Sequence, residues 1–195
     1  MRTTKDGSER HLEAAELRAG LDRILDAPKH EGVLVMIVRR PATGQREELA
    51  EGALTPDEGL VGDGWRSHMA PVTAESPFEP DTQITLMNSR VAALVAQDTA
   101  RWALAGDQLF VDLDLSETNM PPGTRLAIGT AVLEVATKPH TGCRKFVDRF
   151  GLEAMKFVNS AEGRALHLRG IYAKVVAAGT IKPRDRVSVL RRSKF

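Results

Sequence analysis

The chain has 195 residues, of which 42% are hydrophobic and 27% are charged, as in an ordinary soluble globular protein. Its 27 basic and 26 acidic residues leave a net charge of +1, so the charge balance gives no electrostatic footprint for nucleic acid. No apolar stretch approaches the roughly 20 residues that span a bilayer. Residues 1–10 lack the apolar segment of a signal peptide. We therefore expect a cytoplasmic protein with neither nucleic-acid nor membrane partners.

The length fits one domain, or one domain with a short N-terminal attachment. Within residues 9–26, the apolar positions have helical spacing and Pro28 follows as a helix stop: Ala14, Leu17, Leu21, Ile24 and Leu25. We expect a helical extension over residues 1–30, one main domain over 31–190 and a basic tail over 191–195.

The next segments alternate between extended and helical patterns. Residues 33–38 form a short branched apolar run that predicts a buried strand. A long loop rich in proline, glycine and acidic residues follows over 55–80. Residues 83–87 predict another strand, which leads into a helix that begins after Asn88 and ends near Gly106.

The second half of the chain is mostly short strands. The pattern predicts one helix over 146–158, interrupted at Gly151, among strands at 110–115, 125–128, 131–137, 171–177 and 186–190. Short strands joined by glycine and proline turns indicate a barrel or a strongly bent mixed sheet, and argue against a parallel α/β fold. The predicted fold class is mainly β, of α+β character, with a few peripheral helices.

Cys143 is the only cysteine, so it has no partner in the chain for a disulfide. Gly142 precedes it, and the cations Arg144 and Lys145 follow. Free cysteine is usually a small buried hydrophobe. These neighbours suit a loop better than a core, and nearby positive charge favours the reactive thiolate. We expect a reachable, reactive thiol, with a buried packing role as the alternative.

Common catalytic motifs are missing from the sequence. There is no phosphate loop, no G-x-G-x-x-G, no H-E-x-x-H and no G-x-S-x-G. The five histidines never fall at a metal-ligand spacing of three or four residues. Nucleotide-loop, zinc-protease and serine-hydrolase chemistries are therefore not predicted.

Several segments resemble the MOSC domain, which is named for the C-terminal domain of molybdenum cofactor sulfurases. The most specific is Pro-His-Thr-Gly-Cys-Arg-Lys-Phe at 139–146, with Leu-Glu-Val at 133–135 before it and Arg-Phe-Gly at 149–151 after it. The likeness covers roughly residues 30–190, and its less specific parts lie at 59–63, 122–129, 163–164, 168–175 and 179–181.

The resemblance implies a compact β-barrel like the barrel domain of pyruvate kinase, and a cysteine that carries sulfur or contacts molybdenum. Larger relatives have a pyridoxal-phosphate domain in front of the barrel. This chain is too short to hold one, so we expect a stand-alone small member of bacterial type. Eukaryotic relatives reduce N-hydroxylated compounds with bound molybdenum cofactor.

Under this resemblance Cys143 is the molybdenum ligand or persulfide carrier, and His140 exchanges protons near neutral pH. A pterin cofactor also carries a phosphate, which helix starts and arginine bind well. The predicted cofactor contacts are Asn88, Ser89, Arg90, Gln108, Thr141, Gly142, Arg144, Lys145 and Arg169.

Some of these residues have a purely structural alternative. Asn88 and Ser89 suit helix caps, and Arg144 and Lys145 suit a solvated surface. Arg169 has the alternative of an exposed charge at the end of a strand. Tyr172, the only tyrosine, is expected to pack.

One departure from the family pattern bears on the cofactor. Relatives that bind it firmly tend to carry Arg-x-Asn before the strand that follows the central helix. The corresponding residues here are Gly106-Asp107-Gln108. The resemblance therefore implies that one guanidinium contact to the cofactor phosphate is missing at position 106.

Three functions remain open from the sequence. The first is a protein that binds molybdenum cofactor or carries sulfur between donor and acceptor proteins. The second is a molybdenum-dependent reductase of N-hydroxylated compounds, which needs an external redox partner because the chain has no flavin or iron–sulfur motif. The third is a non-catalytic barrel that binds an anionic molecule or a protein. Whether the protein is an enzyme is left open.

Overall fold

The structure is a computed structural model that describes residues 10–66 and 80–190. Three parts of the sequence predictions lie outside these residues: the first nine residues of the N-terminal extension, positions 67–79 of the long loop and the basic tail. No helix among the described residues is long and apolar enough to cross a membrane.

The described helices are α1 (Ala14–Ala19), α2 (Leu21–Leu25), α3 (Ser89–Ala96), α4 (Arg144–Phe150), α5 (Leu152–Asn159) and α6 (Ala161–Ala165), with 3₁₀ helices at Pro80–Thr82 and Thr99–Ala105. The strands are β1 (Glu31–Arg39), β2 (Glu47–Glu48), β3 (Gly52–Thr55), β4 (Gly59–Leu60), β5 (Ile84–Asn88), β6 (Leu109–Asp112), β7 (Arg125–Ile128), β8 (Ala131–Val135), β9 (Ile171–Ala177), β10 (Gly179–Ile181) and β11 (Arg186–Leu190).

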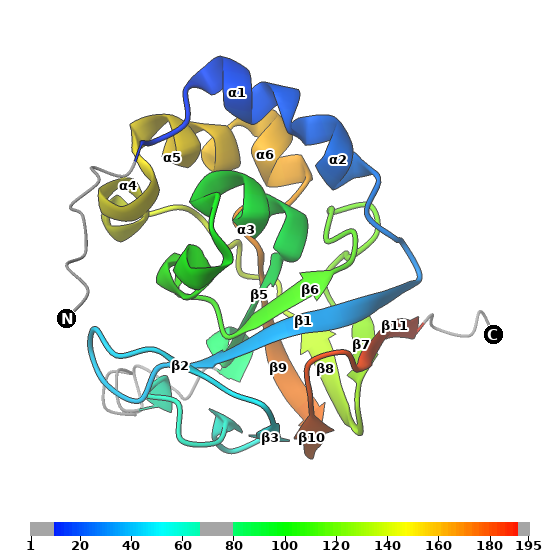
Figure 1. Ribbon diagram of the computed structural model, residues 1–195. Coiled ribbons are helices and arrows are strands. Elements are labelled where there is room, and N and C mark those ends of the chain that lie inside the picture. Colours follow the sequence, from blue (N-terminus) through cyan, green and yellow to red (C-terminus); the bar gives the residue numbers. More distant parts are fainter. Residues whose placement is uncertain (1–9, 67–79, 191–195) are drawn as a thin grey trace, which may run out of the picture.

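Seven strands form a closed mixed barrel in the order β11-β7-β8-β9-β5-β6-β1, and the pairing of β1 with β11 completes the ring (Figure 1). The β5–β6 pair is parallel, and the other described pairs of the ring are antiparallel. Strand β2 extends the edge of β1, and β3, β4 and β10 form a small separate sheet. The predicted mainly-β barrel is confirmed.

Alternating side chains explain the barrel interior. In β8 the buried positions Ala131, Leu133 and Val135 alternate with half-buried ones, as expected where one face of a strand turns inward. Its partner β7 contributes Leu126 and Ile128 from the matching register. The residues of this first core are thus almost all aliphatic, and they fill the ring.

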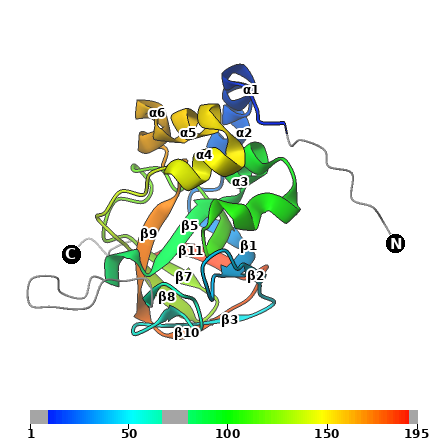
Figure 2. The ribbon, with the colours of Figure 1, turned by 90° about the vertical axis from the view of Figure 1, so that its left-hand side faces the viewer.

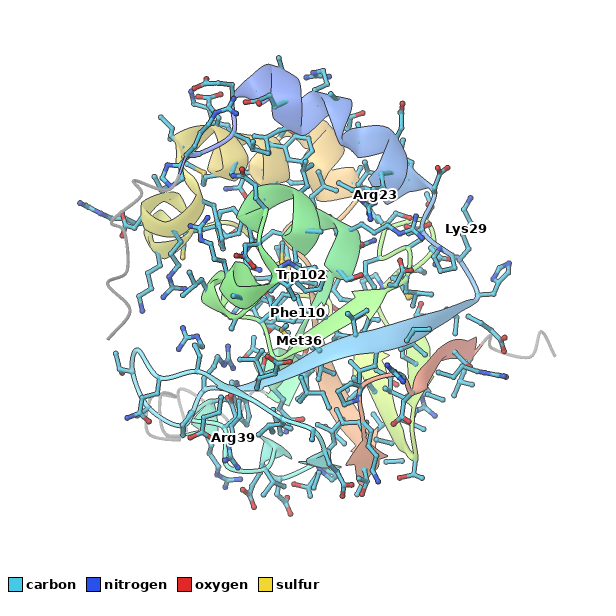
Figure 3. The ribbon with its side chains drawn as sticks, in the orientation of Figure 1. Arg23, Lys29, Met36, Arg39, Trp102 and Phe110 are labelled. Atoms are coloured by element: carbon cyan, nitrogen blue, oxygen red, sulfur yellow. The ribbon has the colours of Figure 1, made fainter. Side chains whose placement is uncertain are left out.

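The six helices gather at one side of the barrel in both ribbon views (Figures 1 and 2). A second core lies between them and the strands. Met36, Trp102 and Phe110 lie close together there (Figure 3), and the Trp102 and Phe110 ring centroids are 5.8 Å apart. Leu17 and Leu21 of the N-terminal helices also belong to this second core.

Three predicted helices are each divided. The helix expected from after Asn88 to near Gly106 is α3 followed by the 3₁₀ helix at Thr99–Ala105. The helix expected over 9–26 is α1 followed by α2, divided at Gly20, because glycine is a weak helix former. A Cβ at Gly20 would meet the Leu94 side chain of α3, so the absence of a side chain lets α3 pack closely there. The helix expected over 146–158 is α4 followed by α5, separated at Gly151 as the sequence indicated. The Cys143 segment therefore leads directly into α4.

Candidate functional site

Cys143 lies immediately before α4 and its side chain is exposed. The loop that carries it is attached to the end of α5 by Asn159. The Gly142 amide donates to Asn159 Oδ1 at 2.8 Å, and Asn159 Nδ2 donates to the Gly142 carbonyl at 3.1 Å. The thiol is thus reachable and sits on a loop with a fixed position, so the alternative of a buried packing role is excluded.

A cavity of about 420 Å³ opens beside Cys143. It collects side chains from the end of β1, the segment after the 3₁₀ helix, the Cys143 loop, α4 and the start of β9. Most of its charged lining is cationic, namely Arg40, Arg46, Lys138, Lys145, Arg149 and Arg169. A cavity with this lining favours an anionic ligand.

Arg40 is held by a buried carboxylate. Its Nε and Nη2 atoms donate to Asp63 Oδ2 and Oδ1 at 3.1 and 2.9 Å, and its Nη1 donates to the Gly106 carbonyl at 2.7 Å. The Asp63 side chain is fully buried. A two-pronged contact of this kind fixes the guanidinium plane. The Gly-Asp element at 62–63 therefore positions Arg40, and its charge balances that of Arg40.

Arg169 forms a second buried pair. Its Nη1 lies 2.7 Å from Asp107 Oδ2, its Nη2 donates to the Ala105 carbonyl at 3.0 Å, and its guanidinium lies 5.2 Å from the centre of the Phe146 ring. Only 7% of Arg169 is exposed. The alternative of an exposed strand-end charge is therefore wrong.

His140 is buried against the same pair. Its side chain is 7% exposed, and its ring centroid lies 4.4 Å from that of Tyr172. Burial lowers the pKa of His140 well below 6.5, and the charges of Arg169 and Arg40 lower it further. The lowered pKa favours the neutral form of His140 and argues against the expected proton exchange near pH 7, so that role stays a prediction.

Polar atoms without partners cluster at this point. His140 Nδ1 and Asp107 Oδ1 face each other at 3.6 Å, which is too long for a hydrogen bond, and neither has another partner among the described residues. Arg169 Nε and Arg46 Nε are also buried and have no hydrogen-bond partner in the part of the chain that the structure describes. Buried polar atoms are nearly always hydrogen-bonded. The cavity wall therefore offers donors and acceptors that a bound molecule can use.

Three predicted contacts lie elsewhere. Asn88 Oδ1 accepts from the Arg90 amide at 2.8 Å and so caps α3, while Asn88 Nδ2 donates to the Leu113 carbonyl. Arg90 Nε lies 2.7 Å from Asp112 Oδ1. Asn88, Ser89 and Arg90 do not line the Cys143 cavity. Asn88 and Arg90 instead hold the start of α3 to β6 and the residue after it.

Of the six remaining predicted contacts, two line the Cys143 cavity and four do not. Lys145 and Arg169 line the cavity with Cys143 and His140, whereas Arg144 is exposed outside it. Gln108 is fully buried behind the wall, where its Nε2 donates to the Gln83 carbonyl at 2.8 Å. Thr141 lines a neighbouring cavity of about 430 Å³ that shares His140 and Lys138 with the first. Gly142 is the loop anchor described above.

Sequence reasoning missed Arg40, Arg46, Asp107 and Arg149 as members of the site. The hydrogen bond from Arg40 to Gly106 joins residues 66 positions apart, so local spacing carries no sign of it. Arg149 had a signal, because it belongs to the Arg-Phe-Gly segment that carries the family resemblance. Asp107 also had a signal in the sequence, since it lies in the segment Gly106-Asp107-Gln108, where this chain departs from the family's Arg-x-Asn pattern.

A family model for the MOSC domain matches residues 73–188. The chain belongs to the MOSC domain family. Among solved structures, this MOSC protein resembles the YuaD protein of Bacillus subtilis, with a TM-score of 0.57 and 15% identity over 84% of this chain and 97% of that one. It also resembles YiiM of Escherichia coli, with a TM-score of 0.53 and 19% identity over 84% of this chain and 72% of that one. The sequence matches none of the curated proteins.

The MOSC family is associated with the binding of molybdenum cofactor, and the donor set of this cavity fits such a group. It combines an exposed thiol, cations and buried polar atoms that lack partners. Within residues 10–66 and 80–190, no cluster of three or more His, Cys, Asp or Glu side chains is placed to hold a metal ion. A metal at Cys143 would therefore depend on ligands of its own, as a dithiolene cofactor provides.

Proposed function

We propose that this MOSC protein binds a molybdenum–pterin cofactor in the cationic cavity and uses Cys143 as a sulfur ligand of the metal. The observation that carries the proposal is the position of Cys143, exposed at a cavity that is rich in positive charge. A soft thiolate suits molybdenum, and the cations suit the phosphate of the pterin. When bound, the cofactor supplies a metal centre with sulfur ligands and redox chemistry.

Positive charge remains in the cavity after its internal pairs are counted. Asp63 balances Arg40, and Asp107 balances Arg169. Lys138, Lys145, Arg46 and Arg149 form no ion pair with a carboxylate of the described residues. This residual charge favours a polyanionic ligand and gives a reason for it to enter this cavity rather than another.

The chain's own residues then have distinct tasks. Asn159 holds the loop so that the Cys143 sulfur faces outward at a fixed place. Arg169 and Asp107 keep the wall beside it rigid. Neutral His140 offers a hydrogen-bond donor or acceptor without adding charge, because its pKa is lowered by burial.

The sulfur-carrier role is the alternative use of the same thiol. The Cys143 thiolate would take a sulfane sulfur from a donor persulfide, whose remaining sulfur leaves as a thiolate, and would pass it on in the reverse sense. That exchange needs a donor and an acceptor protein but no bound metal. The exposed position of Cys143 permits it.

One comparison tests the proposal. The protein is purified from cells that make the cofactor, and molybdenum and cyanide-releasable sulfur are measured in the wild type, in Cys143→Ser and in Arg125→Gln, a control whose side chain pairs with Glu134 away from the cavity. We expect about one molybdenum per chain in the wild type and the control and a loss of most of it in Cys143→Ser.

The other outcomes select the other functions. Labile sulfur without molybdenum, lost in Cys143→Ser, would support the sulfur carrier. Neither metal nor sulfur in the wild type would contradict both roles of the thiol and leave an anion-binding barrel. Where molybdenum is present, turnover of an N-hydroxylated compound with a supplied reductase tests the reductase function.

A further inference from the structure

A second cavity, of about 600 Å³, adjoins the one beside Cys143. The two share six lining residues, namely Arg40, Arg46, Trp65, Thr82, Lys145 and Arg149. The second cavity continues past them to the turn at 42–44 and to Asp148. The shared residues therefore mark a junction, and three of its four cations, Arg46, Lys145 and Arg149, form no ion pair with a carboxylate of the described residues.

The junction is built around Gly106. A Cβ atom at this position would lie 3.7 Å from Arg149 Nη1 and 4.0 Å from Arg46 Nη2, so both guanidinium groups face the space that a side chain would occupy. Gly106 has a φ of 88°, a left-handed conformation that glycine adopts without strain. Two arginines from distant segments thus meet over a residue that has no side chain.

Each arginine is held by contacts with the chain. Arg149 belongs to the last turn of α4, and its Nη1 donates to the Leu104 carbonyl at 2.5 Å. Arg46 follows the turn after β1, and its Nη1 donates to the Gln45 carbonyl at 2.5 Å. Arg46 Nε is buried without a partner among the described residues. Donors remain on both side chains for a ligand.

Like charges meet here, and none of Arg46, Lys145 and Arg149 forms an ion pair with a carboxylate of the described residues. Asp63 is engaged by Arg40, and Asp148, the other carboxylate of the second cavity, forms no ion pair with Arg46, Lys145 or Arg149 in the described part of the chain. Burial lowers the pKa of Arg46, the charges of Arg149 and Arg40 lower it further, and the charge of Asp63 raises it in part. The three cations therefore repel one another, and a bound anion would offset that repulsion.

We propose that Arg46, Arg149 and Lys145 form a binding subsite for a phosphate group at the junction of the two cavities. The inference rests on the proposed function and deepens it, because the subsite would hold the phosphate of the molecule that meets Cys143. Guanidinium groups match the geometry of phosphate oxygens, and a lysine adds a point charge. Firmly binding relatives tend to carry an arginine where this chain has Gly106. Arg46 and Arg149, whose guanidinium groups lie next to Gly106, would take over the phosphate contact of that arginine.

Inorganic phosphate tests this subsite on the full-length, metal-free protein. Its dissociation constant is measured from the shift in melting temperature at constant ionic strength, with chloride as the balancing anion. We expect Arg46→Gln to weaken phosphate binding about tenfold or more, because it removes charge-assisted hydrogen bonds. Arg144→Gln is the matched control, since Arg144 is exposed next to Cys143 but does not line either cavity.

One further variant and one further measurement guard against a folding artefact. Arg46→Lys keeps the charge but lacks the planar guanidinium group that can donate two parallel hydrogen bonds. We expect its phosphate affinity to lie between that of the wild type and that of Arg46→Gln. In chloride, Arg46→Gln should melt no lower than the wild type, because it removes the repulsion with Arg149. Wild-type protein without phosphate binding, or equal weakening in Arg46→Gln and Arg144→Gln, would overturn the subsite.

The proposed function can fail separately. Phosphate binding lost in Arg46→Gln, in a protein that never contains molybdenum, supports the subsite and contradicts the cofactor. Molybdenum retained in full by Arg46→Gln, with phosphate binding unchanged, contradicts the subsite and leaves the role of Cys143 intact. Cys143→Ser should bind phosphate as the wild type does.

Discussion

At the scale of single residues, the cavity contains arginines of two kinds. Arg40 and Arg169 are paired with fully buried carboxylates and stabilise the wall of the cavity. Arg46 and Arg149 bond backbone carbonyls and keep their charge unbalanced. The first kind fixes the geometry and the second supplies the attraction for an anion. This division gives each arginine a different expected response to substitution.

Asp107→Ala should be among the most destabilising single changes in the protein. It leaves Arg169 buried without its counter-ion, and breaking a buried ion pair from one side costs about 3–5 kcal/mol. Urea unfolding followed by circular dichroism gives the free energy of unfolding. Glu31→Ala, which removes an exposed pair with Arg186, is the control and should stay within about 0.5 kcal/mol. Equal effects of the two changes would contradict the buried pair.

His140 should make stability depend on pH in the acidic range. Its pKa is 6.5 when unfolded and well below that when folded, so below about pH 6.5 the unfolded chain binds a proton that the folded chain does not. Between about pH 7 and about pH 5.5 the wild type should lose about 1 kcal/mol that His140→Gln does not lose. Urea unfolding of both proteins at the two pH values measures the difference.

The direction of the pH dependence of stability distinguishes the contribution of His140 from that of Asp107. Burial raises the pKa of Asp107, so protonation of that carboxyl favours the folded state as the pH falls, the opposite of His140. Asp107 is present in both proteins of the comparison and largely cancels. A wild type that gains stability over this range relative to His140→Gln would show that His140 is charged in the folded protein.

The sequence predicted the exposure of Cys143 from its immediate neighbours, and that prediction is confirmed. It did not predict the environment of Arg169, because the partner Asp107 lies 62 positions away and both look like surface charges in a local window. The prediction for Arg90 missed its ion pair with Asp112 for the same reason, since the two residues lie 22 positions apart. Local context thus reveals the reactive residue but not the charges arranged around it.

At the scale of elements, most strands were predicted well, although β6 ends at Asp112 and not at 115 as expected. The β7–β8 hairpin and strands β9 and β11 have the expected positions. The small sheet of β3, β4 and β10 was not predicted as a unit, because its strands have two to four residues and β3 pairs with β10 across more than a hundred positions. Long-range pairing of such short strands leaves little local signal.

The loop before α4 should depend on one side chain. Asn159→Ala removes both contacts to Gly142, and we expect a loss of about 1–2 kcal/mol in stability. The Cys143 thiol should also react severalfold faster with a disulfide reagent, because the loop can then open locally. Stopped-flow or slow mixing with Ellman's reagent gives the rate.

A second asparagine distinguishes local opening from general instability. Asn119 donates to the carbonyls of Lys29 and Asp114, away from Cys143. Asn119→Ala should destabilise the protein by a similar amount without changing the thiol rate. If both variants accelerate the reaction equally, Asn159 does not act on the Cys143 loop in particular.

At the scale of the whole molecule, the barrel is closed by strands from the two ends of the described chain. The ion pair between Glu31 of β1 and Arg186 of β11 joins residues 155 positions apart. Composition and turn residues predicted a barrel or a bent sheet, but not this closure, because no local pattern specifies which strands meet. The family resemblance supplied that part of the prediction.

The two cores predict different results for shortening the chain at either end. A chain that begins at Glu31 loses α1 and α2, which contribute Leu17, Leu21 and Ile24 to the second core and nothing to the barrel interior. A chain that ends before Arg186 loses β11, which pairs with both β1 and β7 and contributes Val187 to the barrel interior. Only the second change opens the ring.

We therefore expect the shortened N-terminal variant to keep slow hydrogen exchange in β7 and β8 while exchange in α3 accelerates. Burial of each large aliphatic side chain contributes about 1.5–3 kcal/mol, so this variant loses stability but keeps a cooperative transition. Without β11, the unpaired edges of β1 and β7 should abolish that transition. Hydrogen exchange read by mass spectrometry compares the two chains. Fast exchange throughout both would contradict a barrel domain over residues 31–190 that is separable from the helical extension over 1–30.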